Sequence, residues 1–196
     1  ARLILEHARQ GALGDAQVVA IVGRTAASRG NALAQEFDVA FATDRAGLIA
    51  QQPDAVIEAA SHDAVRTYAL PLLEQGISFI VLSGGALADD ALRGRLEQAA
   101  AQHRAFLYVP SGGIGGLDAL KAVCAAGADE VGIEVTKPPA AWKNIPYVDQ
   151  QRIDLDRLAG PVVLFEGSAR DGVPHFPANV NIAAVLSMAG IGFDRT

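Results

Sequence analysis

The sequence predicts an α/β fold with a doubly wound parallel sheet, followed by a smaller α+β region. Along the first part of the chain, short apolar runs rich in β-branched residues alternate with segments of helical hydrophobic spacing. The connections are short, as in parallel sheets whose crossovers are helices. A Gly-rich loop directly after one apolar run places a candidate ligand site at the carboxyl end of the strands.

Continuous apolar runs predict the strands, since strands covered on both faces lack a polar alternation. The predicted strands are residues 18–22, 55–59, 77–82 and 105–109. Helices are predicted between them from apolar spacing and from stop signals such as Gly76. The predicted helices cover residues 1–13, 28–37, 44–51, 63–75 and 89–102, with another after Asp118.

The character of the sequence changes near residue 129, so we expect two parts, residues 1–128 and 129–196. In the second part, an alternating pattern over 131–135 and an apolar run over 162–165 predict strands, and residues 181–189 predict a helix. This pattern is typical of an α+β region packed on the first part.

The composition excludes several functional classes. The 196 residues carry a formal net charge of −6, which disfavours nucleic-acid and anionic-membrane surfaces. No apolar run approaches the length of a membrane span. A single cysteine, Cys124, fits a reducing compartment and predicts a cytoplasmic protein. The four histidines are scattered, so we expect no metal site.

The Gly-rich loop, Pro110 to Leu120, is the main candidate site. Glycine lets a backbone approach a ligand closely because no Cβ intervenes. Gly113 and Ser111 lie in this loop after the strand over 105–109. The alternative is a tight strand-to-helix turn that binds nothing.

A dinucleotide-binding fold normally opens with a strand and a Gly-rich turn. This chain opens with a helix, and the run over 18–22 has the character of the second strand of such a fold. We therefore expect a Rossmann-like domain whose first strand and phosphate loop, together with a C-terminal part, lie outside this sequence. The alternative is a complete but unusual α/β domain.

Arg24 and Thr25 follow the strand over 18–22, where NAD-specific folds carry an acidic residue for the ribose hydroxyls. An arginine there accommodates a 2′-phosphate through charge-assisted contacts. We hypothesise that NADP is accepted; the alternative is that Arg24 and Arg29 are solvated loop residues.

Several motifs in the same order resemble one family, the L-aspartate dehydrogenases. They are DAVIEAASHDAVRTYALPLLEQG (54–76), LSGGALADDAL (82–92), VPSGGIGGLDAL (109–120), TKPPAAW (136–142), FEGSAR (165–170) and FPANVNIAAVLSMAGIGFDRT (176–196). The family usually has Ala where Gly113 stands, a departure that should preserve a backbone contact.

The resemblance implies the cofactor, NAD or NADP, and its contacts. Gly113 stands where the family contacts NAD through the backbone, and Asn181 stands where it holds the cofactor, with Asn179 close by. Ala60 and Ser61 should run beside the ribose and nicotinamide. The family's catalytic histidine lies beyond Thr196, so no catalytic residue is assigned in this sequence.

The implied reaction is the reversible reductive amination of oxaloacetate with ammonia to L-aspartate, in a cytoplasmic homodimer serving pyridine nucleotide biosynthesis. Candidates for substrate contact are His62, Ser111 and Lys137, with Arg170 as a further cation. Lys137 is equally interpreted as a solvated residue before a rigid Pro-Pro turn, and Arg170 as a partner of Asp171 or another acid.

Two other functions stay open. One is a related NAD(P)-dependent oxidoreductase of a small amino or keto acid, such as a homoserine dehydrogenase-like enzyme. The other is a nucleotide-binding protein without catalysis. The sequence leaves the cofactor preference, the direction and the oligomeric state undecided.

Overall fold

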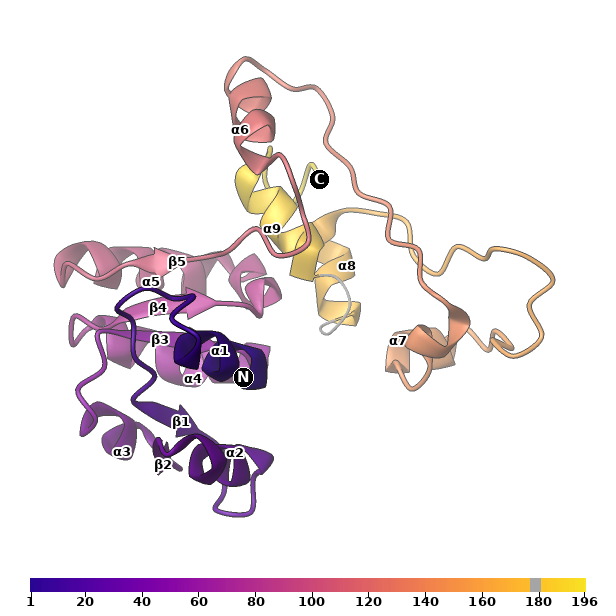
Figure 1. The fold of residues 1–196 in the computed structure, drawn as a ribbon. Coiled ribbons are helices and arrows are strands. Elements are labelled where there is room, and N and C mark those ends of the chain that lie inside the picture. The colour runs from indigo at the N-terminus through magenta and orange to yellow at the C-terminus, as the bar shows by residue number, and fades with distance from the viewer. Residues whose placement is uncertain (177–180) are drawn as a thin grey trace.

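The computed structural model describes residues 1–176 and 181–196, and within them the strands are all parallel, which confirms the α/β fold class. One sheet pairs β1 (Ala20–Val22) with β2 (Ala40–Ala42), and the other has the order β3 (Ala55–Glu58), β4 (Ser78–Val81), β5 (Leu107–Tyr108). Figure 1 shows the two sheets with their helices in one half of the molecule. Strand β2 was not predicted from the sequence.

The helices of this half follow the predicted segments closely. The 3₁₀ helix η1 (Gly84–Ala88) was not predicted, and α6 (Leu117–Ala125) lies apart from the sheets, next to α9 (Asn181–Ala189) (Figure 1). The other helices are α1 (Arg2–Arg9), α2 (Arg29–Phe37), α3 (Arg45–Ile49), α4 (His62–Leu73) and α5 (Asp90–Gln102). Three of them begin with a side-chain cap that accepts a backbone N–H: Asp44, Ser61 and Asp89. These caps explain why the predicted starts were accurate to within a residue.

The main hydrophobic core lies between the second sheet and α4 and α5. Phe79 and Val81 of β4 are fully buried there, against Leu72 of α4 and Leu96 of α5. On the opposite face of the sheet, Ile57, Ile80 and Tyr108 lie in register. Ile57 and Tyr108 are 44% and 58% exposed, so this face is largely open within the described residues.

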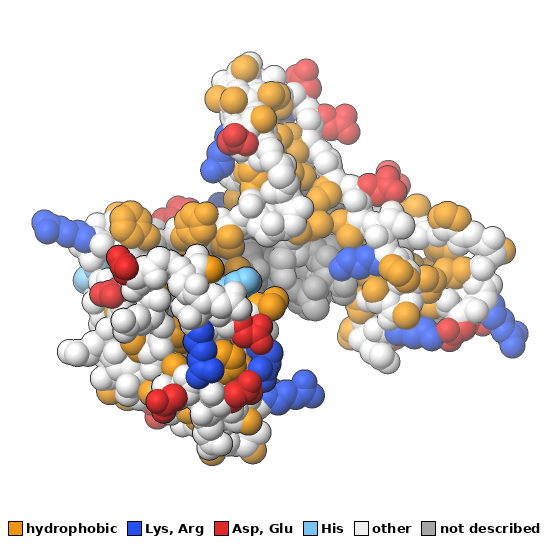
Figure 2. Space-filling view, in the orientation of Figure 1, with side chains coloured by type: hydrophobic (Ala, Val, Ile, Leu, Met, Phe, Trp, Pro, Cys, Tyr) orange, Lys and Arg blue, Asp and Glu red, His pale blue; other side chains and the backbone are white. Residues whose placement is uncertain are grey.

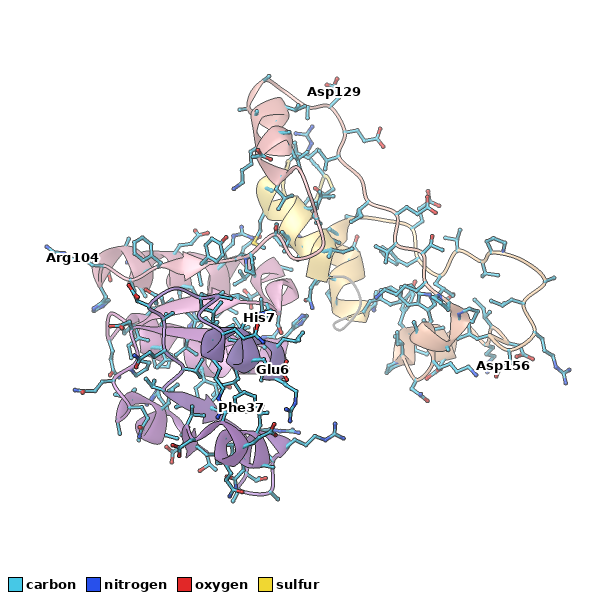
Figure 3. The ribbon with its side chains drawn as sticks, viewed as in Figure 1. Glu6, His7, Phe37, Arg104, Asp129 and Asp156 are labelled. Atoms are coloured by element: carbon cyan, nitrogen blue, oxygen red, sulfur yellow. The ribbon has the colours of Figure 1, made fainter. Side chains whose placement is uncertain are left out.

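Helix α1 is held against α2 by both charge and packing. Leu5 is buried, and the Arg2 guanidinium donates two hydrogen bonds to the carboxylate of Glu36. The guanidinium groups of Arg2 and Arg9 also lie over the ring of Phe37, which Figure 3 labels beside α1. The Arg2 hydrogen bonds lower the pKa of Glu36.

The strands predicted over 131–135 and 162–165 are wrong, because the structure has irregular backbone at both places. An extended segment needs a neighbour to pair its N–H and C=O groups, and neither run has one among the described residues. Val163 is accordingly 74% exposed. Between Asp129 and Asp156 the chain runs out to a separate lobe around α7 (Figure 3), where hydrophobic side chains lie at the surface (Figure 2).

The second half of the chain contains short helices joined by irregular backbone. Its elements are η2 (Pro139–Trp142), α7 (Pro146–Gln150), α8 (Ala169–His175) and α9 (Asn181–Ala189). Helix α9 has the bounds predicted from the sequence, and Ala184 in it is fully buried. It packs on η1 and α8, so its first residue lies beside the ends of β3 and β4. No helix of the described residues is both long and apolar enough to span a membrane.

Candidate functional site

The carboxyl ends of β3 and β4 are fastened together by one buried carboxylate, Glu58. Its Oε1 accepts hydrogen bonds from the N–H groups of Ala60 (2.7 Å) and Ser61 (2.9 Å) and from the hydroxyl of Ser83 (2.9 Å). Its Oε2 accepts the N–H of Ser83 at 2.9 Å. Glu58 is only 4% exposed. A buried charge is tolerated when hydrogen bonds satisfy it, and here four donors do so.

Ala60 and Ser61 therefore have a structural task at the strand end. Their N–H groups are used by Glu58, and the Ser61 hydroxyl accepts the N–H of Ala64 as the cap of α4. Both residues are exposed, so their surfaces border the strand ends. The sequence placed both residues at the strand end but did not identify the carboxylate that holds them.

His62, Gly85 and Asn181 meet at the same edge, from three different elements. Asn181 Oδ1 accepts the N–H of Gly85 at 3.0 Å and lies 3.1 Å from His62 Nε2. The approach is tight: a Cβ on Gly85 would lie 2.6 Å from His62 Nε2 and 3.0 Å from Asn181 Oδ1. The structure thus joins two predicted site residues, His62 and Asn181, that are 119 positions apart.

Gly113 and Ser111 lie in an exposed loop after β5. Gly112 and Gly116 have φ values of +60° and +73°, which favour glycine, and Ile114 N–H donates to the carbonyl of Ser111. A Cβ at Gly113 would meet nothing within 4 Å. The loop backbone is therefore accessible from outside.

Arg24 and Thr25 form the exposed turn after β1. The N–H of Thr25 donates to the Ser28 hydroxyl at 3.1 Å. Gly23 is required before this turn, because a Cβ there would lie 2.8 Å from the ring of Phe41 in β2. The turn is shaped by these contacts and leaves the Arg24 side chain at the surface.

The structure places Lys137 in a different environment from His62 and Asn181. Its Nζ lies 5.5 Å from the centre of the Trp142 ring, and its carbonyl accepts the Trp142 indole N–H. Trp142 in turn packs edge-on against Phe176. His175, which follows α8's Pro174, stacks on Tyr147 at 4.1 Å between ring centres, so it belongs to the same aromatic cluster.

Arg170 is engaged in ion pairs. It donates from Nε and Nη2 to Asp194, pairs with Asp90 at 3.0 Å, and donates to the carbonyl of Ala88. The Arg170 hydrogen bond lowers the pKa of Asp194, and the Asp194 hydrogen bond raises that of Arg170. The predicted alternative that an acid pairs with Arg170 holds, but the acids are Asp194 and Asp90.

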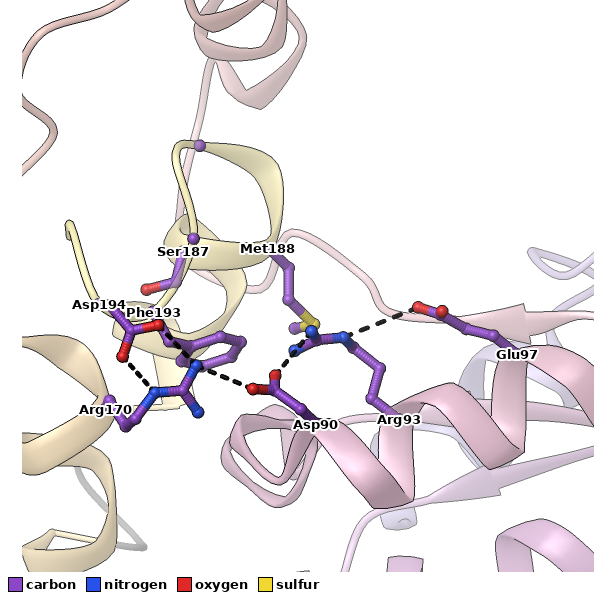
Figure 4. A pocket seen from close by; sticks show the side chains of 10 residues that line it. Asp90, Arg93, Glu97, Arg170, Ser187, Met188, Phe193 and Asp194 are labelled. Atoms are coloured by element: carbon purple, nitrogen blue, oxygen red, sulfur yellow. Dashed lines mark hydrogen bonds and ion pairs between the residues drawn. The ribbon is translucent and has the colours of Figure 1, made fainter.

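These residues line a pocket of ≈ 440 Å³ between α5, α8 and the end of α9, drawn in Figure 4. Arg93 lies across it, paired with Asp90 at 2.7 Å and with Glu97 at 3.8 Å. Both arginines of the pocket are paired with carboxylates, so neither is available to bind an anionic ligand. The ion pair between Arg170 and Asp90 joins α8 to α5.

Two further predictions concern Asn179 as a cofactor contact and the expectation of no metal site. Asn179 lies outside the described residues. No group of three or more His, Cys, Asp or Glu side chains suited to a metal ion occurs in the described part of the chain.

Two protein families match successive parts of the chain. Residues 118–196 match the family described as aspartate dehydrogenase, C-terminal. Residues 1–110 match the family described as homoserine dehydrogenase, NAD binding domain.

Curated relatives carry the name L-aspartate dehydrogenase. That of Methanosarcina acetivorans is 47% identical over 143 residues, which are 73% of this chain and 53% of the relative. L-aspartate dehydrogenase 2 of Bordetella bronchiseptica is 45% identical over 179 residues, or 91% of this chain and 65% of the relative. The chain thus spans about half to two thirds of the length of these relatives.

The fold also matches a solved structure, the crystal structure of the aspartate dehydrogenase from Thermotoga maritima. The TM-score is 0.70 at 28% sequence identity, and the match covers 96% of this chain and 70% of the other. The similarity therefore includes both halves of the chain.

Proposed function

Because the chain belongs to the L-aspartate dehydrogenase family, with an amino-terminal part of the homoserine dehydrogenase NAD-binding type, we propose that the whole protein is an NAD(P)-dependent L-aspartate dehydrogenase. The reaction is the reversible reductive amination of oxaloacetate with ammonia. The observation that carries this proposal is the position of the Asn181 amide near the carboxyl ends of β3 and β4. Its Oδ1 accepts the N–H of Gly85 in η1 and lies 3.1 Å from Nε2 of His62 at the start of α4. In open α/β sheets this edge is where ligands bind.

The chain's own residues suit a nicotinamide dinucleotide. Asn181 offers two amide N–H donors, and no described residue accepts a hydrogen bond from them in the contacts at this edge. Gly113 offers an unobstructed backbone in the loop after β5. Ala60 and Ser61 are exposed at the carboxyl end of β3. Arg24 and Thr25 would lie at the adenosine end, where Arg24 suits a 2′-phosphate.

The arrangement of the strands supports the same proposal. The strands form β2–β1 and β3–β4–β5, all parallel, and β1 is not hydrogen-bonded to β3. A dinucleotide-binding sheet has its first strand between the second and the fourth. We propose that a strand outside this sequence occupies that position and that its Gly-rich turn binds the pyrophosphate.

For the chemistry, the bound cofactor supplies hydride transfer. The protein must hold the substrate carbon at the nicotinamide and must move protons as ammonia adds to the carbonyl and water leaves. We propose that a histidine outside this sequence moves these protons. Among the residues of this chain, His62 and Ser111 follow the carboxyl ends of β3 and β5. Lys137 lies beside Trp142 instead and would have to leave that ring to contact substrate.

We propose a homodimer formed through the second half of the chain. The apolar runs that do not pair as strands here, with Val163 74% exposed, are suited to pairing with further chain. Measuring the mass of the protein in solution tests this part of the proposal separately.

The activity is tested by following the absorbance of NADPH and of NADH with oxaloacetate, with and without ammonium, using the full protein expressed from its gene. Oxidation that depends on ammonium is expected with at least one cofactor. Oxidation independent of ammonium would indicate a hydroxy-acid dehydrogenase instead. No oxidation with either cofactor would overturn the assignment.

A second candidate is an oxidoreductase of the homoserine dehydrogenase kind, favoured by the family matched over residues 1–110. The same assay with aspartate semialdehyde in place of oxaloacetate and ammonium separates the two. The match of residues 118–196 favours aspartate.

A further inference from the structure

The side-chain oxygen of Asn181 is held by two groups at once. The N–H of Gly85 and the Nε2 of His62 lie 3.0 Å and 3.1 Å from Asn181 Oδ1. A backbone N–H is always a donor, so the atom facing Gly85 must be the amide oxygen and cannot be the amide nitrogen. The orientation of the Asn181 side chain is therefore fixed by the backbone.

This orientation also fixes the protonation of His62. An amide oxygen only accepts, so His62 Nε2 must carry a hydrogen and donate it to Asn181. In the neutral ring, Nδ1 is then the acceptor. The geometry assigns one tautomer to a ring whose hydrogens would otherwise be undetermined.

The position of His62 is itself fixed from the strand end. His62 is the first residue of α4, directly after the capping residue Ser61. The N–H of Ser61 is held by the buried Glu58 at 2.9 Å. The imidazole also lies directly above Gly85, where any Cβ would come within 2.7 Å of its Nε2 and Cε1. The ring is therefore confined by the covalent chain on one side and by Gly85 on the other.

We propose that His62 is a positioning residue for cofactor binding. Its Nε2–H holds Asn181 Oδ1, so that the Nδ2 amino group is turned outward and one of its hydrogens donates to an acceptor oxygen of the cofactor, such as a carbonyl or a hydroxyl. This inference rests on the proposed function of Asn181 in binding NAD(P). It assigns His62 a role different from the substrate contact expected from its place in the sequence.

A matched pair of variants isolates the hydrogen bond. His62→Gln and His62→Met have side chains of equal length, and only Gln carries a donor at the position of Nε2. The dissociation constants of NADH and NADPH are measured by fluorescence for both variants and for the unaltered full protein. We expect His62→Met to weaken binding about tenfold, as the loss of one hydrogen bond does, and His62→Gln to stay within about threefold.

A second measurement is independent of activity. The ¹⁵N spectrum of the histidine side chains, assigned by comparison with His62→Gln, reports the tautomer of His62 at alkaline pH, where the ring is neutral. We expect a protonated Nε2 and an unprotonated Nδ1.

The outcomes separate the two proposals. If the unaltered protein binds neither NADH nor NADPH, the proposed function fails, whatever the spectrum shows. If it binds one of them and His62→Met binds it equally well, or if the spectrum shows a protonated Nδ1, the role of His62 is overturned while the function stands. Equal weakening in Gln and Met would also overturn it, because the donor would then not be what matters.

Discussion

Glu58 joins the ends of β3 and β4, and its replacement by glutamine tests whether this carboxylate organises the site. In Glu58→Gln one acceptor oxygen becomes an NH₂ group. If the remaining oxygen takes the place of Oε1, the contacts with Ala60, Ser61 and the Ser83 hydroxyl survive. The N–H of Ser83, now 2.9 Å from Oε2, would then face another donor.

The cost follows from these contacts. A hydrogen bond to a charged group contributes roughly 1.5–3 kcal/mol, and leaving a buried donor unpaired costs roughly 1–3 kcal/mol. Part of this is offset because the buried charge is removed, so we expect a loss of about 3 kcal/mol. At about 2–4 °C per kcal/mol for a domain of this size, the melting temperature should fall by roughly 6–12 °C.

The assay is thermal unfolding followed by circular dichroism, with two comparison variants. Ser83→Ala removes only the hydroxyl donor and should cost about 1 kcal/mol. Glu130→Gln changes an exposed glutamate and should lie within about 0.5 kcal/mol of the unaltered protein. If Glu58→Gln melts at the same temperature as Glu130→Gln, the carboxylate does not hold the strand ends and the reasoning is refuted.

Other variants test the remaining parts of the site. Arg24→Asp should raise the dissociation constant of NADPH about tenfold or more and that of NADH far less, because only NADPH carries the 2′-phosphate; equal effects would contradict this. Gly85→Ala should weaken NADH binding severalfold by displacing the imidazole and amide beside it, whereas Gly94→Ala, with open space around its Cβ, should not. Arg170 lowers the pKa of Asp194, so their pairing stabilises the fold above about pH 4 and is lost as the pH falls through that lowered pKa; Asp194→Asn should flatten this acid dependence in equilibrium unfolding.

The sequence predicted the elements whose signals are local. Continuous apolar runs located β3 and β4, and helix α9 has its predicted bounds, because apolar spacing and capping act within a few residues. Strand β2 escaped prediction because three residues, Ala40–Ala42, give no period to recognise. Residues 131–135 and 162–165 have the composition of strands but no partner in the described chain, and pairing is a property of the neighbour as much as of the segment.

The candidate site was predicted in part. His62 was singled out from its place after a predicted strand and Asn181 from the family resemblance, but their contact spans 119 positions and only the fold brings them together. Glu58 lies in the predicted strand over 55–59. Its hydrogen bonds to Ala60, Ser61 and Ser83 depend on the turns that follow β3 and β4, and the sequence does not give the shape of those turns. The requirement for glycine at position 85 is steric and arises from His62, so the sequence alone could not identify it.

The acids that pair with Arg170 show the same limit. Asp171 is its neighbour in sequence, yet Ser168 holds Asp171 as a cap of α8. Arg170 pairs instead with Asp194, 24 residues away, and with Asp90 of α5. Charge pairing across helices follows packing and not proximity in the sequence.

The most direct test of the account is NADH binding to Asn181→Asp in the full protein, measured by fluorescence beside the unaltered protein. Aspartate keeps an oxygen that accepts the N–H of Gly85 and the Nε2–H of His62, but it replaces the two outward donors by an acceptor. The account predicts a nearly unchanged melting temperature and a dissociation constant raised about tenfold or more, since a lost hydrogen bond of about 1.5 kcal/mol corresponds to that factor. A fully folded Asn181→Asp that binds NADH as tightly as the unaltered protein would contradict it.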